Sequence, residues 1–383
     1  MLKYVFAEKF FLENEVVGPG YLEIKEGTFG DFYKDKPNET KEVLDYSGYS
    51  IAPGLVDTHI HGFKNHDLMA TDEEGLNSIS EGLLSCGVTS FLATTLTSST
   101  EILNKVVKMV GDNYKSVKGA KIKGIFLEGP FFTEKYKGAQ NPKYFGDPTI
   151  DKLKTWQELS SGTIKKIAIA PERKGVLEFI EYATKNNINV ALGHSNATYE
   201  EAKLAVEKGA SLFVHTYNGM RPLNHREPGM VGAAMNLKDV FAELICDGHH
   251  VHPVAANILM DVRGRKETVL ITDCMMAGGM PEGQYELGEF PVEVKDGAAR
   301  LESGSLAGSV LELKDAVKNV VKWGIATPEE AIYMATAVPA KSVGIDNECG
   351  KIAPGYAADF IVLNSHLDLQ ATFLNGDCRY QIN

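Results

Sequence analysis

Two histidines separated by one residue are the strongest sign of chemistry in this sequence. His59 and His61 stand near the end of the stretch Pro53-Gly54-Leu55-Val56-Asp57-Thr58-His59-Ile60-His61-Gly62, directly after an apolar run. Residues i and i+2 of a β-strand point to the same face, so both imidazoles would aim at one point. A pair of solvated histidines at a strand end has the same spacing. The Pro-Gly lead, the Asp and the following Gly favour the interpretation as metal ligands.

Later apolar runs also end in residues that bind metals or move protons. These residues are Glu128, His194, His215 and Asp273. Each of them alone has a structural explanation, as a hydrogen-bonded histidine or a capping carboxylate. Together with His59 and His61 they offer four imidazoles and two carboxylates, which suit one or two divalent ions such as zinc or iron.

The chemistry expected of such a set is metal-assisted hydrolysis. A divalent ion lowers the pKa of bound water to about 7 and polarises a carbonyl group. Glu128 could bridge two ions. Asp273 could be a ligand, a general base or both in turn, because a nearby carboxylate can take a proton and later give it to the leaving group.

Eight apolar, strand-like runs alternate with amphipathic, helix-like segments and would position these residues. The runs are 51–61, 88–95, 122–128, 164–170, 188–194, 211–215, 240–246 and 268–273. The helix-like segments are 72–85, 100–110, 175–186, 199–208 and 253–263. Continuous apolar runs are typical of parallel strands covered on both faces, so the pattern predicts a (β/α)8 barrel. Such barrels carry their chemistry at the C-terminal ends of the strands, where the candidate residues stand.

The chain ends have β character and predict a second unit. We expect a small β-sandwich domain from residues 1–50 plus 350–383, and a barrel domain from residues 51–349. Strand-like pieces at 284–287, 291–294 and 298–301 suggest a hairpin or lid over the barrel mouth. Helices are expected at 312–322 and 328–343.

Composition excludes several function classes. The formal net charge is −12, which argues against a protein that wraps nucleic acid. The five cysteines are scattered without a CxxC pair, so a disulfide framework is not expected. The N-terminus has no apolar core typical of a signal peptide, and no apolar run reaches the roughly 18 residues of a membrane span. We therefore expect a cytoplasmic protein without membrane or nucleic-acid partners.

Longer motifs surround the candidate residues along nearly the whole chain. They are Leu127-Glu128-Gly129-Pro130-Phe131, Leu192-Gly193-His194-Ser195-Asn196-Ala197-Thr198, His215-Thr216-Tyr217-Asn218-Gly219-Met220, Arg226-Glu227-Pro228-Gly229, Asp247-Gly248-His249-His250-Val251-His252-Pro253, Thr272-Asp273 and Leu306-Ala307-Gly308-Ser309. With the first stretch, they resemble the amidohydrolase superfamily and, within it, the N-acetylglucosamine-6-phosphate deacetylase family. The resemblance implies hydrolysis of the acetamide of N-acetyl-D-glucosamine 6-phosphate to D-glucosamine 6-phosphate and acetate, in amino-sugar catabolism and recycling.

The resemblance also implies residue roles. Glu128, His194 and His215 would bind the metal that every member needs, and Asp273 would be the catalytic acid/base. His250 would help polarise the acetyl carbonyl or contact the phosphate, and Arg226 would hold the 6-phosphate, for which a guanidinium fork is suited. The remaining sugar contacts would be Ala139, Gln140, Asn218, Gly219, Leu306, Ala307 and Gly308. Phosphate contacts from a neighbouring subunit would make the protein a homodimer.

Two departures and two alternatives stay open. Some members lack the His-x-His pair and hold one metal, so the number of ions is open here. Gln140 stands where some members carry His. A Gln amide can donate a hydrogen bond but cannot titrate, so a proton-transfer role at this position stays open. A ring-opening amidohydrolase would bridge two metals with a carboxylated lysine from strand 4, where this chain has lysines only at the start of the run, Lys165 and Lys166. A barrel that only binds a sugar phosphate is disfavoured because the ligand set and Asp273 are present.

Overall fold

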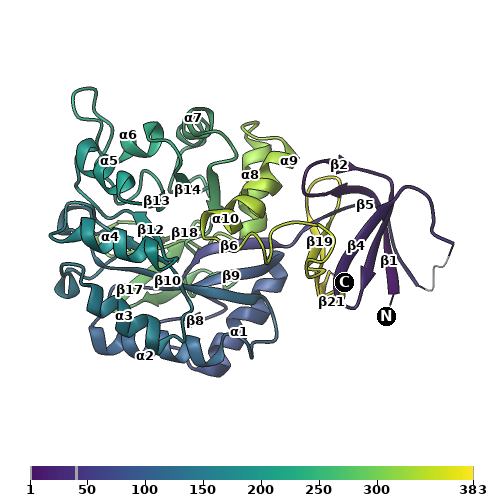
Figure 1. Cartoon of the computed structure of the whole chain (residues 1–383), viewed down its shortest axis with the longest axis horizontal. Coiled ribbons are helices and arrows are strands. Elements are labelled where there is room, and N and C mark those ends of the chain that lie inside the picture. Colours follow the sequence, from purple (N-terminus) through teal and green to yellow (C-terminus); the bar gives the residue numbers. More distant parts are fainter. Residues whose placement is uncertain (1, 39–41, 383) are drawn as a thin grey trace.

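The computed structural model describes residues 2–38 and 42–382, and the chain forms a barrel with a separate sheet at one end (Figure 1). Eight parallel strands make the barrel in the order of the sequence. They are β6 (Leu55–Ile60), β9 (Val88–Thr95), β10 (Lys121–Phe131), β11 (Ile164–Ile169), β12 (Asn189–Leu192), β13 (Ala210–Phe213), β14 (Phe241–Ile245) and β15 (Thr268–Ile271). The predicted (β/α)8 barrel is confirmed.

The barrel closes just beyond the ends of its first and last strands. Asp273 N donates to His59 O at 2.9 Å, and His61 N donates to Cys274 O at 2.8 Å. The closing contacts are therefore made by the residues that carry the candidate chemistry. The predicted first run divides at Gly54, because residues up to Pro53 pair with another sheet and only Leu55 onward enters the barrel.

Helices surround the barrel (Figure 1). They are α1 (Glu73–Leu83), α2 (Thr100–Asn113), α3 (Ile150–Leu159), α4 (Val176–Lys185), α5 (Tyr199–Glu207), α6 (Gly229–Asn236), α7 (Pro253–Arg263), α8 (Leu313–Lys322), α9 (Pro328–Met334) and α10 (Ala337–Ser342). The sequence did not predict α3 and α6. The helix predicted over 328–343 is two helices, because Pro339 lacks the N–H that a continuous helix would bond to Ala335 O.

Both chain ends build the second sheet, whose strand order is β21-β20-β19-β5-β1-β3-β4, with β2 beside β1. Its strands are β1 (Leu2–Phe11), β2 (Val16–Val17), β3 (Gly20–Lys25), β4 (Thr28–Tyr33), β5 (Val43–Pro53), β19 (Phe360–Leu363), β20 (Leu369–Leu374) and β21 (Asp377–Gln381). The sheet curls until β4 meets the segment before β19, where Phe29 N donates to Tyr356 O at 2.8 Å. The sandwich predicted from the termini is thus one curled sheet. The exact boundaries of the two domains stay a prediction.

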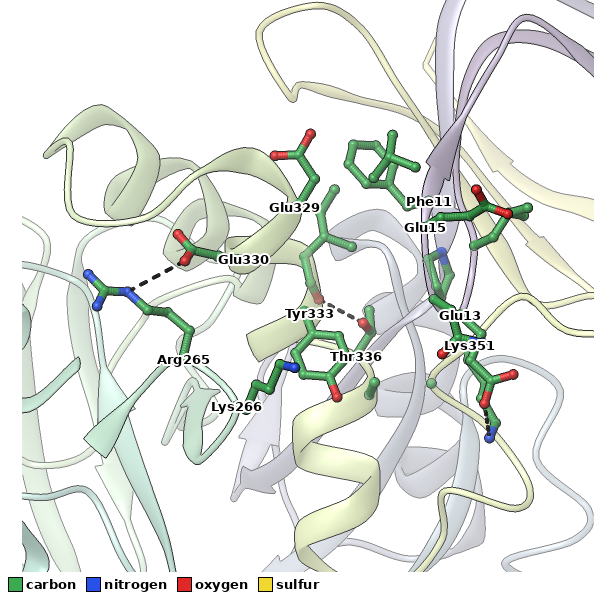
Figure 2. A pocket seen from close by; sticks show the side chains of 17 residues that line it. Phe11, Glu13, Glu15, Arg265, Lys266, Glu329, Glu330, Tyr333, Thr336 and Lys351 are labelled. Carbon is green, nitrogen blue, oxygen red and sulfur yellow. Dashed lines mark hydrogen bonds and ion pairs between the residues drawn. The ribbon is translucent and has the colours of Figure 1, made fainter. Parts of the chain in front are cut away.

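A pocket of about 550 Å³ lies where the terminal sheet meets the barrel (Figure 2). Its lining combines Phe11 and Glu13 of the terminal unit with Arg265, Glu330 and others of the barrel unit. Its lining includes no member of the candidate metal set. The pocket therefore marks the seam between the two units and not the predicted site.

Two small sheets lie at the barrel mouth: β7 (Gly62–Phe63) with β8 (His66–Asp67), and β16 (Gly283–Leu287), β17 (Phe290–Lys295) and β18 (Ala298–Arg300). The three-stranded sheet packs apolar side chains such as Val292 against Met275 and Ala307 beside Asp273. At its tip, Glu289 accepts from Asn141 Nδ2 at 2.7 Å and from Tyr144 OH at 2.5 Å. The predicted lid is thus a sheet fastened over the barrel mouth. No helix among the described residues is long and apolar enough to cross a membrane.

Candidate metal centre

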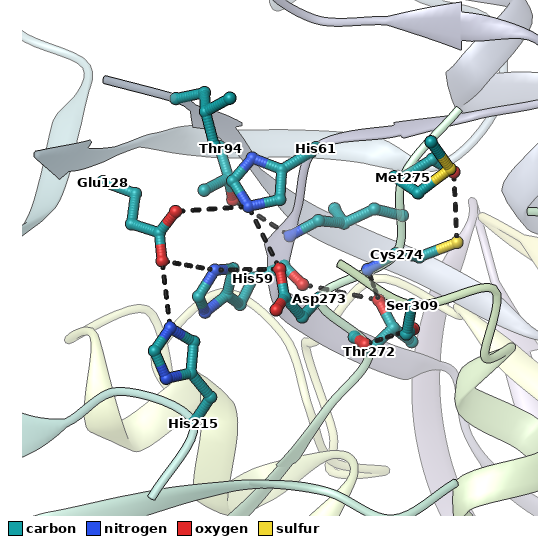
Figure 3. A network of polar contacts seen from close by, with 12 residues as sticks. His59, His61, Thr94, Glu128, His215, Thr272, Asp273, Cys274, Met275 and Ser309 are labelled. Atoms are coloured by element: carbon teal, nitrogen blue, oxygen red, sulfur yellow. Dashed lines mark hydrogen bonds and ion pairs between the residues drawn. The ribbon is translucent and has the colours of Figure 1, made fainter. Parts of the chain in front are cut away.

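The six candidate residues converge at the C-terminal end of the barrel, and Figure 3 shows all of them except His194. His59 lies in β6 and Glu128 in β10, while His194, His215 and Asp273 follow β12, β13 and β15. Three overlapping groups among them have ligand atoms within 4.8 Å of one another: His59, His61 and Glu128; His59, His215 and Asp273; Glu128, His194 and His215. All six are buried, with Asp273 the most exposed at 9%.

Glu128 lies at the centre of the set. Its Oε1 is 3.3 Å from Nε2 of His59, 3.3 Å from Nε2 of His194 and 3.2 Å from Nε2 of His215. Its Oε2 is 3.4 Å from His61 Nε2. Asp273 Oδ1 lies 3.1 Å from His61 Nε2 and 3.5 Å from His59 Nε2. One carboxylate therefore reaches all four imidazoles, and a second faces the strand-1 pair.

The hydrogen bonds behind His194 and His215 fix which ring nitrogen faces inward. His194 Nδ1 is 3.0 Å from Tyr136 O, and His215 Nδ1 is 3.1 Å from Asn218 O. A carbonyl oxygen only accepts, so both Nδ1 atoms donate and both Nε2 atoms of the neutral rings carry lone pairs. These two Nε2 atoms face each other at 3.1 Å. Two lone pairs at that distance repel unless a cation lies between the ligands, so the donor set fits a divalent ion.

The electrostatics of the cage also favour positive charge. Burial lowers the pKa of His59, but Asp273 and Glu128 outweigh it and raise that pKa to about 9. Burial opposes ionisation of Glu128 as well, yet His59 and the other imidazoles hold its pKa well below the usual value. The pKa of Asp273 is lowered in the same way by His59 and His61 against the effect of burial. The two carboxylates are therefore ionised and attract cations.

The backbone at three of these residues is strained. His194, His215 and Asp273 have φ of 45°, 24° and 52°, in the left-handed region that side chains avoid. Such conformations cost about 1–3 kcal/mol each and cluster at functional sites. In all three cases the strain turns a side chain inward immediately after a barrel strand.

Several residues predicted to contact the sugar line this centre. Gly219 approaches His194 so closely that a Cβ there would lie 2.8 Å from Nδ1 of the imidazole. The buried Asn218 Nδ2 has no hydrogen-bond partner among the described atoms. Gly308 runs beside Asp273, because Ser309 N donates to Asp273 O at 2.7 Å. Leu306 is half-buried, and Ala307 and Ala139 belong to the apolar cluster under the lid sheet.

Gln140, which the sequence predicts to contact the sugar, is hydrogen-bonded at both ends of its amide within the protein. Its Nε2 donates to Glu128 Oε2 at 2.5 Å, and its Oε1 accepts from Thr97 N at 3.0 Å. Both ends of this buried amide are therefore engaged within the protein. The side chain orients the central carboxylate.

Arg226 and His250 lie on loops outside the cluster. Arg226 is exposed and hydrogen-bonds to His225 Nε2 at 3.0 Å. His250 Nδ1 is 2.6 Å from Asp247 Oδ2. Burial raises the pKa of Asp247, but the hydrogen bonds from His250 outweigh it and lower the pKa. Over residues 2–38 and 42–382, neither side chain forms a hydrogen bond or ion pair with the cluster.

Sequence reasoning missed two buried charges beneath the cluster. Glu243 on β14 accepts from His59 Nδ1 at 3.1 Å and pairs with Lys166 of β11. Burial raises the pKa of Glu243, but Lys166 and His59 outweigh it and lower the pKa to about 2. Burial lowers the pKa of Lys166, and Glu243 opposes that shift. The available signals were two adjacent lysines, Lys165 and Lys166, at the start of one apolar run and a single glutamate inside another.

Fold and centre together define a metal-dependent hydrolase of the (β/α)8 type, with ligands at strand ends and a carboxylate at the mouth. The chain belongs to the amidohydrolase family, whose model matches residues 50–382.

Individual relatives are also similar over most of the chain. The N-acetylglucosamine-6-phosphate deacetylase of Vibrio furnissii is 42% identical over 85% of this chain and 82% of its own length. The N-acetylgalactosamine-6-phosphate deacetylase of Escherichia coli O157:H7 is 39% identical over 85% of this chain and 86% of its own length. The solved N-acetylglucosamine-6-phosphate deacetylase of Thermotoga maritima has a TM-score of 0.89 and 31% identity, with both chains covered fully at 100%. That of Mycobacterium smegmatis, solved with N-acetyl-D-glucosamine-6-phosphate, has a TM-score of 0.92 and 29% identity, covering 99% of this chain and 100% of its own.

Proposed function

We propose that this protein hydrolyses the acetamide of N-acetyl-D-glucosamine 6-phosphate, giving D-glucosamine 6-phosphate and acetate, in amino-sugar catabolism and recycling. The observation that carries the proposal is the cage of Glu128, His194 and His215 with Asp273 across it. The similarity to N-acetylglucosamine-6-phosphate deacetylases, at 42% identity over 85% of the chain, supports the substrate.

The metal would be held by Glu128, His194 and His215, with His59 and His61 available for a second ion. A divalent ion held there would lower the pKa of bound water and polarise the acetyl carbonyl. Zinc and iron both suit imidazole and carboxylate ligands.

Asp273 is the group that moves the proton. Its Oδ1 faces the imidazoles of His59 and His61, and its carboxylate is ionised at neutral pH, so it can take a proton from the attacking water. The proton then passes from Asp273 to the departing amine nitrogen. The lid sheet packs on Met275, two residues after Asp273, and on Ala307.

The substrate would lie across the segments that border the cage. Asn218 Nδ2, buried and without a partner among the described atoms, is available for a sugar oxygen or the acetamide. Gly219, Ala139, Leu306, Ala307 and Gly308 would shape the sugar site. Gln140 would also contact the sugar, while its amide donates to Glu128 Oε2. His250, oriented by Asp247, would approach the acetyl group or the phosphate.

Arg226 would bind the 6-phosphate, since a planar guanidinium matches the phosphate oxygens. We expect Arg226→Gln to raise KM for the phosphorylated sugar roughly 10- to 100-fold, as expected from the loss of about 1.5–3 kcal/mol of charged hydrogen bonding. Activity on the unphosphorylated sugar should stay unchanged. Steady-state kinetics on both sugars measures the split, and an unchanged KM contradicts the role.

A homodimer is part of the proposal. One face of α7 presents Val254, Ile258 and Val262, which are 61%, 47% and 51% exposed. These positions recur every fourth residue and form an apolar stripe that a second copy would cover. Sedimentation of the wild-type protein against Ile258→Glu tests this. We also propose a cytoplasmic location, which the five free cysteines suit.

The second candidate substrate is N-acetyl-D-galactosamine 6-phosphate, because a relative with that name is 39% identical. An amine-release assay should compare both phosphorylated sugars and unphosphorylated N-acetylglucosamine. Under the proposal, kcat/KM is highest for N-acetyl-D-glucosamine 6-phosphate. A higher value for the galactose isomer reverses the assignment, and no release from any of them rejects the deacetylase function.

A further inference from the structure

Two charged side chains meet inside the barrel, directly beneath the metal-capable cluster. Lys166 and Glu243 each have 0% of their side chain exposed and form an ion pair. Lys166 also donates to Thr58 O at 3.4 Å, and its Nζ lies 3.7 Å from the centre of the Phe126 ring. Burying a charge pair is often no more stabilising than an apolar pair of similar volume. The pair therefore calls for a role besides stability.

The second oxygen of Glu243 supplies that role. Glu243 Oε2 lies 3.1 Å from His59 Nδ1, and the same atom accepts from His215 N at 3.3 Å. An ionised carboxylate only accepts, so Nδ1 of His59 carries the proton. The other nitrogen, Nε2, is buried without a hydrogen-bond partner among the described atoms and lies 3.3 Å from Glu128 Oε1.

We propose that Lys166 and Glu243 are positioning residues that make His59 a metal ligand. Glu243 fixes the ring and the tautomer of His59, and Lys166 holds the Glu243 carboxylate in place through their ion pair. This inference rests on the proposed metal centre. A carboxylate behind a ligand histidine raises its basicity, and losing such a partner typically costs about 10- to 100-fold in metal affinity.

A variant that tests the role of Lys166 and Glu243 has to remove both charges of the buried pair together. Removing one partner alone would leave an unpaired buried charge and destabilise the fold. The double variant Lys166→Met with Glu243→Gln removes both charges at nearly constant volume. A control is Lys121→Met with Asp359→Asn, which removes a Lys–carboxylate pair between β10 of the barrel and the segment before β19 of the terminal sheet, 2.6 Å apart and outside the cluster.

The main measurement is zinc affinity of the metal-free protein, titrated against a chromophoric chelator. We expect the Lys166/Glu243 double variant to bind zinc about 10- to 100-fold more weakly than the wild type. The control pair should stay within about twofold, because residues without shared partners act independently. Thermal unfolding of the metal-free forms separates affinity from folding.

A double-mutant cycle that includes His59→Gln tests whether Lys166 and Glu243 act through the His59 ring. In a His59→Gln background, adding the double variant should change zinc affinity less than about threefold, because the ring that Glu243 positions is gone. A full additional loss in this background overturns the inference. A merely structural pair would give the same loss in both backgrounds.

The outcomes separate the inference from the proposed function. A wild-type protein that binds no zinc or iron rejects the metal centre and the proposed function with it. Wild-type affinity in a folded double variant rejects the inference alone. If the double variant does not fold, Glu243→Asp replaces it, since this change keeps both charges and withdraws the carboxylate by one methylene. Wild-type zinc affinity in Glu243→Asp likewise overturns the inference.

Discussion

The histidines of the metal cluster are held in two different ways. His194 and His215 donate Nδ1 to backbone carbonyls, at 3.0 and 3.1 Å. His59 instead donates to the carboxylate of Glu243 at 3.1 Å, and Nδ1 of the buried His61 has no partner among the described atoms. Backbone carbonyls thus orient His194 and His215. In the strand-1 half, a carboxylate orients His59, and no hydrogen bond to Nδ1 from the described residues orients His61.

This difference predicts which half can vary. Carbonyl acceptors stay in place whatever side chains their residues carry, so the orientation of the His194 and His215 rings depends on the backbone path at Tyr136 and Asn218. The orientation of His59 depends on a buried ion pair, which substitutions can remove. We therefore expect Glu128, His194 and His215 to be the tighter metal position, and the strand-1 half to be the adjustable one.

The largest effect should come from Asp273, which borders the strand-1 half but is proposed to do the chemistry. Asp273→Asn cannot take a proton from water, so kcat should fall roughly 10³- to 10⁴-fold, the upper range for general acid–base catalysis. Metal content should stay close to wild type, as measured by elemental analysis of the purified protein. Near-normal turnover in this variant would remove Asp273 from its catalytic role.

The next largest effect tests the half held by main chain. His215→Gln removes a proposed ligand of the tight position. A zinc site has a binding free energy of about 10–16 kcal/mol, so each of roughly four ligands contributes about a quarter of it. Zinc affinity should therefore fall about 10²- to 10³-fold. Competition with a chelator measures this. Treating the wild-type enzyme with the same chelator should abolish activity, and added zinc or iron should restore it.

The strand-1 half should respond less. His61→Gln removes an imidazole whose Nδ1 has no hydrogen-bond partner among the described residues to orient it. We therefore expect zinc affinity to fall only about 10-fold, which is the low end of the loss seen when a metal ligand loses its supporting hydrogen bond. The titration should still show the tight position filled. Equal losses in His61→Gln and His215→Gln would show that the two halves are equivalent, and the comparison would fail.

The sequence predicted that the candidate ligands lie together but not which groups support them, and the reason is physical. Strand ends converge on one side of a barrel, so Glu128, His194 and Asp273 could be placed together from the ends of apolar runs. Lys166 and Glu243 lie inside such runs, 77 residues apart, and only barrel closure makes them neighbours. The carbonyls behind His194 and His215 belong to a short 3-10 helix, Glu134–Tyr136, and to a turn at Asn218, whose positions no periodic pattern encodes.

The helices show the same limit. Amphipathic segments such as 253–263 were predicted with correct bounds, because their apolar positions follow the helical period. Helix α6 is buried along most of its length, and its small and apolar residues give little contrast between faces. Pro339 was a usable signal for the break between α9 and α10, since a proline is tolerated only in the first turn of a helix.

The smallest effect should come from Gln140, which supports the ligand shared by both halves. Its amide donates to Glu128 Oε2, the oxygen that faces His61, while Oε1 faces His59, His194 and His215. Gln140→Met removes a neutral donor, so zinc affinity should fall only a few-fold, below the roughly 10-fold minimum typical of a charged supporting partner. Combined with His61→Gln, it should add little, because both changes act on the same oxygen, whereas combined with His215→Gln the losses should multiply. Zinc titrations of the two double variants decide this, and multiplication of the losses in both would show that Gln140 supports Glu128 as a whole and not only the oxygen that faces His61.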